Sequence, residues 1–144
     1  MQKLENAKID ELISDKKIPI RLAYLKPSGV PSVLSLWYVE IGGKIFCATQ
    51  KSAKIVSYLQ NNPSCGFEIA GDKPPYKGAR GEGKARIVEE RGNEILQLLI
   101  DKYLGKKDST LSKFLKIKSK SEVAIEITPK KIFHYDYTNR MKDI

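Results

Sequence analysis

The segment from Ala48 to Lys54 is the most informative for chemistry, because it places several hydrogen-bond donors where an apolar run ends and a helical period begins. It offers the hydroxyls of Thr49 and Ser52 and the ammonium groups of Lys51 and Lys54. Helix N-termini present unpaired N–H groups and a partial positive charge, so these donors would suit a phosphate monoester. The alternative is that Thr49 or Ser52 caps the helix and the lysines are solvated, and spacing alone favours this alternative.

A second unusual stretch alternates small and charged residues over eight positions. One face would carry only glycine and alanine, and the other would be fully charged, because successive side chains of a strand point to opposite sides. A bare face lets a second backbone or a flat ring approach closely. The alternative is a crowded barrel interior behind a solvated outer face. The small residues are Ala79, Gly81, Gly83 and Ala85, and the charged ones are Arg80, Glu82, Lys84 and Arg86.

Nothing in the chain marks a general acid, a general base or a metal site. No paired-carboxylate, Ser-His-Asp or P-loop pattern is present, so the catalytic residues stay unknown. His134 is the only histidine, and the two cysteines, Cys47 and Cys65, lie in apolar runs. We expect two buried, reduced thiols and no bound metal.

Composition limits the class of protein further. The 144 residues fit a single domain, 1–144, with a formal charge of +9 that comes mostly from lysine, at 21 of 26 basic residues. Arginine would be favoured for contacts to phosphate and bases, so nucleic-acid binding is not expected. No run of 18 apolar residues predicts a membrane span, and the polar N-terminus lacks a secretion signal, which together predict a cytoplasmic protein.

Hydrophobic periodicity predicts a mainly β chain with peripheral α-helices. Consecutive strands with short turns indicate antiparallel pairing, and about six of them suggest a closed or nearly closed barrel. The predicted strands are Ile20–Leu25, Ser32–Ile41, Lys44–Thr49, Ser64–Ala70, a long fifth strand ending near Val88, and Glu122–Thr128, which Pro129 breaks before an extended Ile132–Tyr137. The predicted helices are Leu4–Ser14, Ser52–Asn62, Glu94–Leu104 and Thr110–Ile117.

Three motifs in this order resemble the pyridoxamine 5′-phosphate oxidase-like superfamily. The first is the strand pair P-x-V-x-x-L-W-Y-V and G-G-K-I-F-x-A-T, the second is S-x-K opening a helix that ends in N-N-P, and the third is Y-K-G-A-R-G-E-G-K-A. The closing I-T-P-K-K-I-F-H-Y-D is also similar to C-termini of the superfamily. Together these motifs cover roughly residues 18 to 136.

The resemblance implies a six-stranded antiparallel split β-barrel that forms a homodimer with two FMN sites at the subunit interface. It implies that the backbone of one strand borders the flavin ring and that a second group of residues lies near the phosphate. The second subunit would bring Tyr76 and Arg80 towards the cofactor. The ring-side residues are Leu34, Ser35, Leu36 and Trp37; the phosphate-side residues are Thr49, Ser52 and Lys54, with Lys51 as an addition.

The function predicted from this resemblance is an FMN-dependent oxidoreductase acting on an unidentified small substrate. Val33 stands where the oxidases that name the superfamily carry a phosphate-binding arginine, so we do not expect pyridoxamine phosphate oxidation itself. Two alternatives remain open: a reductase that uses a deazaflavin coenzyme, and a non-catalytic flavin carrier or sensor. A basic barrel that binds nucleic acid is the alternative from another class, which the lysine-rich charge disfavours.

Overall fold

The computed structural model describes residues 17–105, 111, 113, 115 and 118–142. The predicted helix Leu4–Ser14 lies outside the described residues, and the predicted helix Thr110–Ile117 lies largely outside them. None of the helices that are described is long and apolar enough to cross a membrane.

The described chain is mainly β, as predicted, but it has seven strands where six were expected. All paired strands are antiparallel, and the sheet order is β2-β1-β5-β6-β7-β4-β3. The strands are β1 (Ile20–Leu25), β2 (Pro31–Leu36), β3 (Val39–Ile41), β4 (Lys44–Gln50), β5 (Ser64–Ala70), β6 (Lys77–Val88) and β7 (Glu122–Asp136). The helices are α2 (Lys54–Asn61) and α3 (Gly92–Leu104), with short 3₁₀ turns at η1 (Glu89–Arg91) and η2 (Lys118–Ser121).

The sheet curls into a barrel because of one short connection. β2 and β3 are the two edge strands of the sheet, yet only Trp37 and Tyr38 separate them in the chain. Two residues can join the edges of a seven-stranded sheet only if the sheet bends round until the edges meet. The single strand predicted over Ser32–Ile41 is therefore wrong, because the chain leaves one edge at Leu36 and joins the other at Val39.

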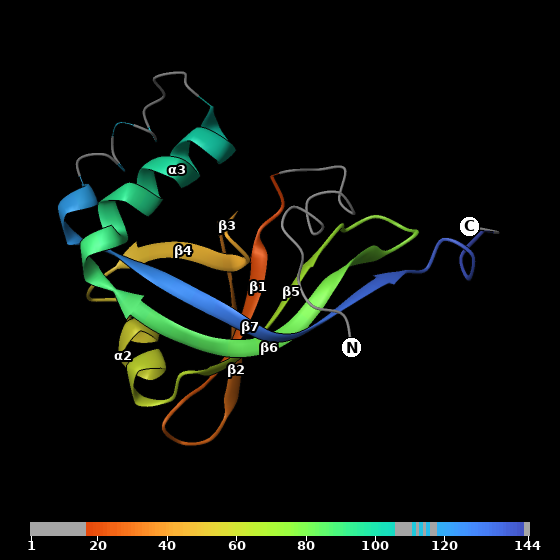
Figure 1. Ribbon diagram of the computed structural model, residues 1–144, viewed down its shortest axis with the longest axis horizontal. Helices are drawn as coiled ribbons and strands as arrows, with labels where there is room; N and C mark the ends of the chain where they lie inside the picture. The colour runs from red at the N-terminus through yellow and green to blue at the C-terminus, as the bar shows by residue number, and fades with distance from the viewer. Residues whose placement is uncertain (1–16, 106–110, 112, 114, 116–117, 143–144) are drawn as a thin grey trace.

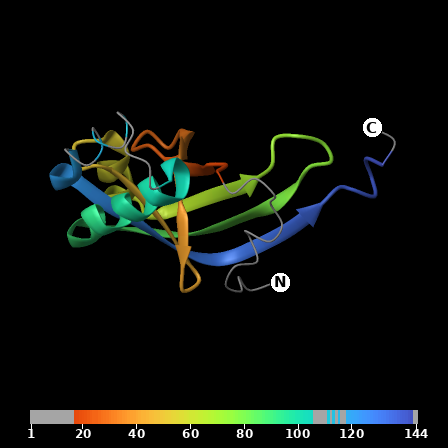
Figure 2. The same ribbon diagram turned by 90° about the horizontal axis from the view of Figure 1, so that it is seen from above.

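Figures 1 and 2 show the helices gathered at one end of the molecule, with β5, β6 and β7 running on towards the C-terminus at the other. The predicted break at Pro129 does not occur, since β7 continues through it to Asp136. The β6–β7 register shifts between Glu82 and Gly83, where Pro129 stands opposite Gly83. A bulge interrupts the hydrogen-bond ladder at this point, so the strand can contain a proline, which has no N–H to donate.

The barrel interior is filled by large aliphatic side chains and the small-residue face of β6. Ala79 and Ala85 are buried there, and a Cβ on Gly81 would lie 2.3 Å from the Lys131 carbonyl oxygen and 2.8 Å from Phe67 Cζ. The crowded-interior interpretation of this face is thus correct. The large residues include Ile20, Leu22, Ile45, Leu59, Ile69, Ile125 and Ile127.

Helix α3 covers a second, smaller cluster on the outer face of the sheet. Ile95, Leu99 and Tyr103 pack there with Phe46 of β4 and Ala124 of β7. The helix begins at Gly92, two residues before the predicted Glu94. A side chain at position 92 would meet the Glu122 carbonyl oxygen at 2.0 Å, so glycine allows α3 to start close against β7.

Both cysteines are buried free thiols, as predicted. Burial raises the pKa of the Cys47 thiol to about 12 and that of Cys65 to about 11. A thiol with such a pKa is almost wholly protonated at neutral pH and is a poor nucleophile.

Candidate functional site

The predicted phosphate segment forms the turn between β4 and α2. α2 begins at Lys54, two residues later than the predicted Ser52, and Ala53 occupies the N-cap position. No side chain makes a capping hydrogen bond there, and the first turn holds no acidic residue. The capping alternative for Thr49 and Ser52 is therefore wrong, and the positive end of α2 is neutralised neither by a cap nor by a carboxylate of its own first turn.

The four predicted phosphate residues differ in their surroundings. Thr49 is half-buried in β4, opposite Val123 of β7, whereas Lys51, Ser52 and Lys54 are exposed. Lys51 Nζ lies 3.3 Å from a carboxylate oxygen of Glu89. Lys54 makes no ion pair with any described carboxylate, so its charge is the more available of the two.

The turn is fixed to the start of β7 by hydrogen bonds. The Lys51 N–H donates to the Ser121 carbonyl oxygen at 2.8 Å, and the Ser121 hydroxyl donates to Gln50 Oε1 at 2.6 Å. The Gln50 amide in turn donates to the carboxylate of Glu122, which stands opposite it across the β4–β7 ladder. Burial raises the pKa of Glu122, although this hydrogen bond opposes the shift. The backbone that precedes α2 is thus held against the start of β7 by three hydrogen bonds.

The predicted ring strand, Leu34 to Trp37, lies at the edge of the barrel. β2 pairs with β1 on one side only. Leu34 and Leu36 turn inward to the core, while Ser35 points outward and accepts a hydrogen bond of 2.9 Å from Arg21. Trp37 follows directly, packed under α3.

Tyr76 and Arg80 line a hollow of about 340 Å³ on the outer face of the sheet. Its floor is formed by Arg21, Glu68 and Arg80, which stand opposite one another on β1, β5 and β6. The same row of the sheet continues to Ser35 of β2 and Phe133 of β7. The loop between β5 and β6 and the end of β7 supply the rest of the lining, which comprises Ala70, Gly71, Asp72, Tyr135 and Tyr137.

Polar contacts organise this hollow around Tyr135. Its hydroxyl donates to Glu68 at 2.7 Å, and the Arg80 guanidinium lies 5.8 Å from the centre of its ring. Burial and the Glu68 carboxylate raise the pKa of Tyr135. The Arg21 guanidinium forms an ion pair with the Asp72 carboxylate at 3.7 Å, whereas Arg80 forms no ion pair with a described carboxylate. The guanidinium of Arg80 is therefore available for an anionic ligand.

The structure groups the predicted site residues into two sets. Ser35, Tyr76 and Arg80 lie along one row and its neighbouring loop, and the hollow that Tyr76 and Arg80 line contains none of the α2 set. The α2 set lies towards the other end of β6, where the Ala85 N–H bonds Pro63 just after α2 (Figure 1). One chain therefore does not bring Arg80 to Lys54.

Arg21, Glu68 and the Tyr135 hydroxyl were not among the predicted site residues. Arg21 and Glu68 are charged residues at outward positions of strands whose inward positions are apolar. That pattern could have marked them as facing solvent. Their meeting with Arg80 depends on the strand order β1-β5-β6, which the chain sequence alone does not show.

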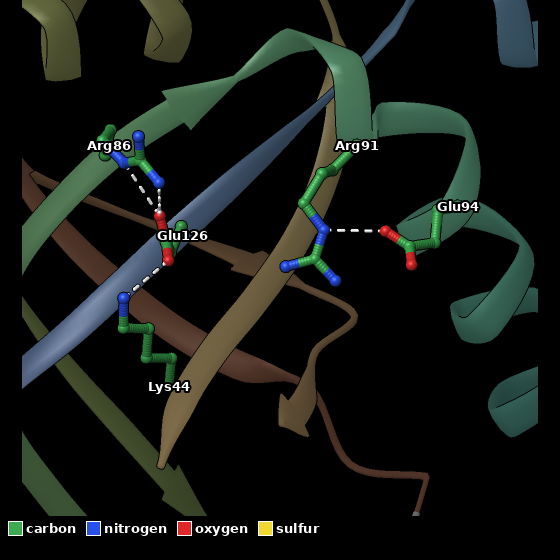
Figure 3. A network of polar contacts seen from close by, with 5 residues as sticks. All are labelled: Lys44, Arg86, Arg91, Glu94 and Glu126. Carbon is green, nitrogen blue, oxygen red and sulfur yellow. Dashed lines mark hydrogen bonds and ion pairs between the residues drawn. The ribbon is translucent and has the colours of Figure 1, made fainter. Parts of the chain in front are cut away.

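A second charged network, around Glu126, holds strands together (Figure 3). The Glu126 side chain is 7% exposed and accepts hydrogen bonds from Lys44 at 2.9 Å and from Arg86 at 2.6 and 2.9 Å. Burial alone would raise the pKa of Glu126, but these bonds outweigh it and hold the pKa below its ordinary value. Both carboxylate oxygens are engaged, so we assign this network to fold stability. Nearby, Arg91 pairs with Glu94 at 2.7 Å and lies 4.6 Å over the Phe46 ring.

No metal cluster of histidine, cysteine or carboxylates occurs among the residues that the structure describes. Neither a family model nor a curated protein matches the chain. Solved structures do match it in fold. A conserved hypothetical protein from Mycobacterium tuberculosis is 23% identical, with a TM-score of 0.76, and the match covers 93% of this chain and 86% of the other.

Two further solved structures with a similar fold have names that state an activity. An F420 reductase is 18% identical, with a TM-score of 0.71 and coverage of 88% of this chain and 96% of its own. A putative pyridoxamine 5′-phosphate oxidase from Listeria innocua is also 18% identical, with a TM-score of 0.62 and coverage of 81% and 86%. The chain therefore has the split-barrel fold of pyridoxamine 5′-phosphate oxidase-like proteins, as its motifs predicted.

Proposed function

We propose that this protein binds FMN as a homodimer and acts as an oxidoreductase on a small substrate. The observation that carries the proposal is the start of α2 on a split-barrel fold: it has no side-chain cap and no acidic first turn, and Lys54 there forms no ion pair with a described carboxylate. A positive helix end with exposed hydroxyl and ammonium donors beside it fits a phosphate dianion.

The phosphate would be held by Ser52 and Lys54, with Thr49 and Lys51 beside them. Ser52 and Lys54 are exposed and can reach an anion without leaving a buried partner. Lys51 would first have to share its charge with Glu89, so we expect it to contribute less. The hydrogen bonds that fix the turn to Ser121 keep the backbone amides in place before the ligand arrives.

The flavin ring would lie along the strand from Leu34 to Trp37. An edge strand offers backbone N–H and C=O groups to a partner, and the ring edge of a flavin carries matching acceptors and donors. A bound flavin supplies hydride or electron transfer, and the residues of this chain hold and orient it.

A second copy of the chain would complete the site. The outer face of β1, β2 and β5 carries Val33, Ala23 and Gly66 in one row, and Val33 is 64% exposed. Such a flat, weakly polar surface suits an isologous contact. Across a two-fold axis it would bring Tyr76 and Arg80 of one chain towards the α2 turn of the other.

A deazaflavin coenzyme is the second candidate for the same groove. The fold match to an F420 reductase supports it, and a lysine-rich surface suits a longer anionic tail. A non-catalytic flavin carrier has the same binding residues and differs only in turnover.

The absorbance spectrum of the purified protein, followed by titration with FMN and with a deazaflavin coenzyme, tests the proposal. We expect visible flavin bands and FMN binding with one ligand per chain. Turnover with reduced nicotinamide then separates an oxidoreductase from a carrier. A protein that binds the deazaflavin alone would transfer the proposal to the second candidate, and one that binds neither ligand would refute both.

A further inference from the structure

The break between β2 and β3 leaves backbone groups that the sheet does not satisfy, and α3 satisfies them. The Tyr38 N–H donates to the Tyr103 hydroxyl at 3.1 Å, and that hydroxyl donates to the Ile18 carbonyl oxygen at 3.0 Å. Lys102 donates to the Tyr38 carbonyl oxygen at 2.8 Å. Both tyrosines are almost fully buried, so these bonds are protected from water.

Aromatic contacts strengthen the same connection. The Trp37 ring lies flat on the Tyr103 ring, with centroids 4.8 Å apart and planes within 5°. The Lys102 ammonium also lies 3.6 Å from the centre of the Tyr38 ring. Two consecutive residues of α3 therefore fix Trp37, the last residue of the proposed ring strand, and Tyr38, which follows it.

We propose that Tyr103 and Lys102 are positioning residues for the cofactor, acting through Trp37 and Tyr38 on the strand Leu34 to Trp37. The inference rests on the proposed function. The contacts of Tyr103 and Lys102 with Trp37 and Tyr38, here called the clamp, fix where β2 ends. A flavin ring bound along the edge of β2 would be positioned by that end. Neither α3 residue needs to touch the flavin for its loss to weaken binding.

The clamp acts on the ring strand and leaves the phosphate turn unchanged. Tyr103→Phe removes only the hydroxyl, so FMN and riboflavin should both bind about tenfold more weakly, because both share the ring. The ratio of the two dissociation constants should stay at its wild-type value. The visible circular dichroism of the bound flavin should also change, since it reports the ring's surroundings.

A purely structural role for Tyr103 predicts a different result. The unfolding temperature would fall, while both dissociation constants and the flavin spectrum would stay as in wild type, and this outcome would overturn the inference. Lys102→Met keeps the side-chain stem and removes the donor, so it supplies a second test if Tyr103→Phe folds poorly. The matched control is Tyr58→Phe, at a residue of α2 whose ring stacks on Tyr24 of β1, and it should leave flavin binding unchanged.

Trp37 is the only tryptophan, so its emission reports the clamp directly. We expect Tyr103→Phe to shift that emission before any flavin is added, and an unchanged emission would contradict the clamp. If wild type binds neither FMN nor riboflavin, the proposed function fails and this inference fails with it. If wild type binds both and Tyr103→Phe binds them equally well, only the inference fails.

Discussion

Replacing Lys54 by alanine should weaken FMN binding by about tenfold to a hundredfold and leave riboflavin binding unchanged. A charge-assisted hydrogen bond contributes about 1.5–3 kcal/mol, and each 1.4 kcal/mol is about a factor of ten in affinity. Lys54 is exposed, so solvent screening places the expected loss nearer the lower value. Riboflavin has no phosphate for the ammonium group to contact.

The fold should not suffer from this substitution. Lys54 opens α2, where a positive charge faces the positive end of the helix dipole and is unfavourable by about 0.3–1 kcal/mol. Alanine removes that repulsion and is a good helix former, so the free energy of unfolding should stay the same or rise. A loss of FMN affinity in Lys54→Ala can then be attributed to the ligand contact.

The assay is a titration of wild type and Lys54→Ala with FMN and with riboflavin at fixed ionic strength. Lys130→Ala removes an exposed charge at the β7 bulge and controls for the change in net charge. Equal weakening of both ligands would show that Lys54 supports the fold and does not contact the phosphate. No weakening of either would move the anion site away from α2, and Arg80 would become the next candidate.

Three further outcomes follow from the structure. Glu126→Gln should lower the free energy of unfolding by about 1–3 kcal/mol at neutral pH, because two cations lose a buried partner. The pKa of Glu126 is depressed in the folded state, so its contribution to the free energy of unfolding is present above the unfolded pKa and is lost as pH falls through the folded pKa. Urea unfolding at neutral and acidic pH should therefore show the stability of the wild type falling towards that of the variant at acidic pH. Val33→Glu should prevent the proposed dimer from forming, so that the variant sediments as a monomer, while Leu98→Glu, at a 39% exposed position on α3, should leave the proposed dimer intact; equal behaviour of the two would place the interface elsewhere. Cys47 and Cys65 should resist thiol reagents at pH 8 in the native protein and react fully in urea, and rapid native labelling would contradict their burial.

The fold was predictable wherever a strand's own residues decide its conformation. The bounds of β1 and β5 match the predicted ones because Ile20–Leu25 and Ser64–Ala70 have apolar residues at their inward positions and are followed by turn residues. Prediction failed where the partner decides. The apolar run Ser32–Ile41 has no internal breaker, and only α3 bonding Tyr38 turns its centre into a connection. Pro129 breaks a strand by local rules, but a bulge opposite Gly83 accommodates it.

The candidate site was predictable only by element. Donor-rich residues at a strand-to-helix junction identify the α2 turn, because the chemistry there is local in sequence. The hollow around Tyr135 depends on β1, β5, β6 and β7 lying side by side in one register. Arg21 and Glu68 are 47 positions apart in the chain, and no local pattern pairs them. The environment of the Gly/Ala face of β6 depends on other strands for the same reason, since Phe67 of β5 and Lys131 of β7 lie against Gly81.

Two cations decide whether the proposed site needs a second chain. Lys54 and Arg80 each lack an ion pair among the described carboxylates, and they lie towards opposite ends of β6. Arg80 is opposite Glu68 and Lys84 is opposite Ser64, so four residues, about 13 Å of strand, separate Arg80 from the α2 end. Within a single chain, Lys54 and Arg80 therefore lie too far apart to hold the same phosphate group. Under two-fold symmetry any contact from Arg80 to the partner's α2 turn is repeated in reverse, so the dimer gains two equal sites and one ligand per chain. A monomer that bound FMN with full affinity would leave Arg80 without this role.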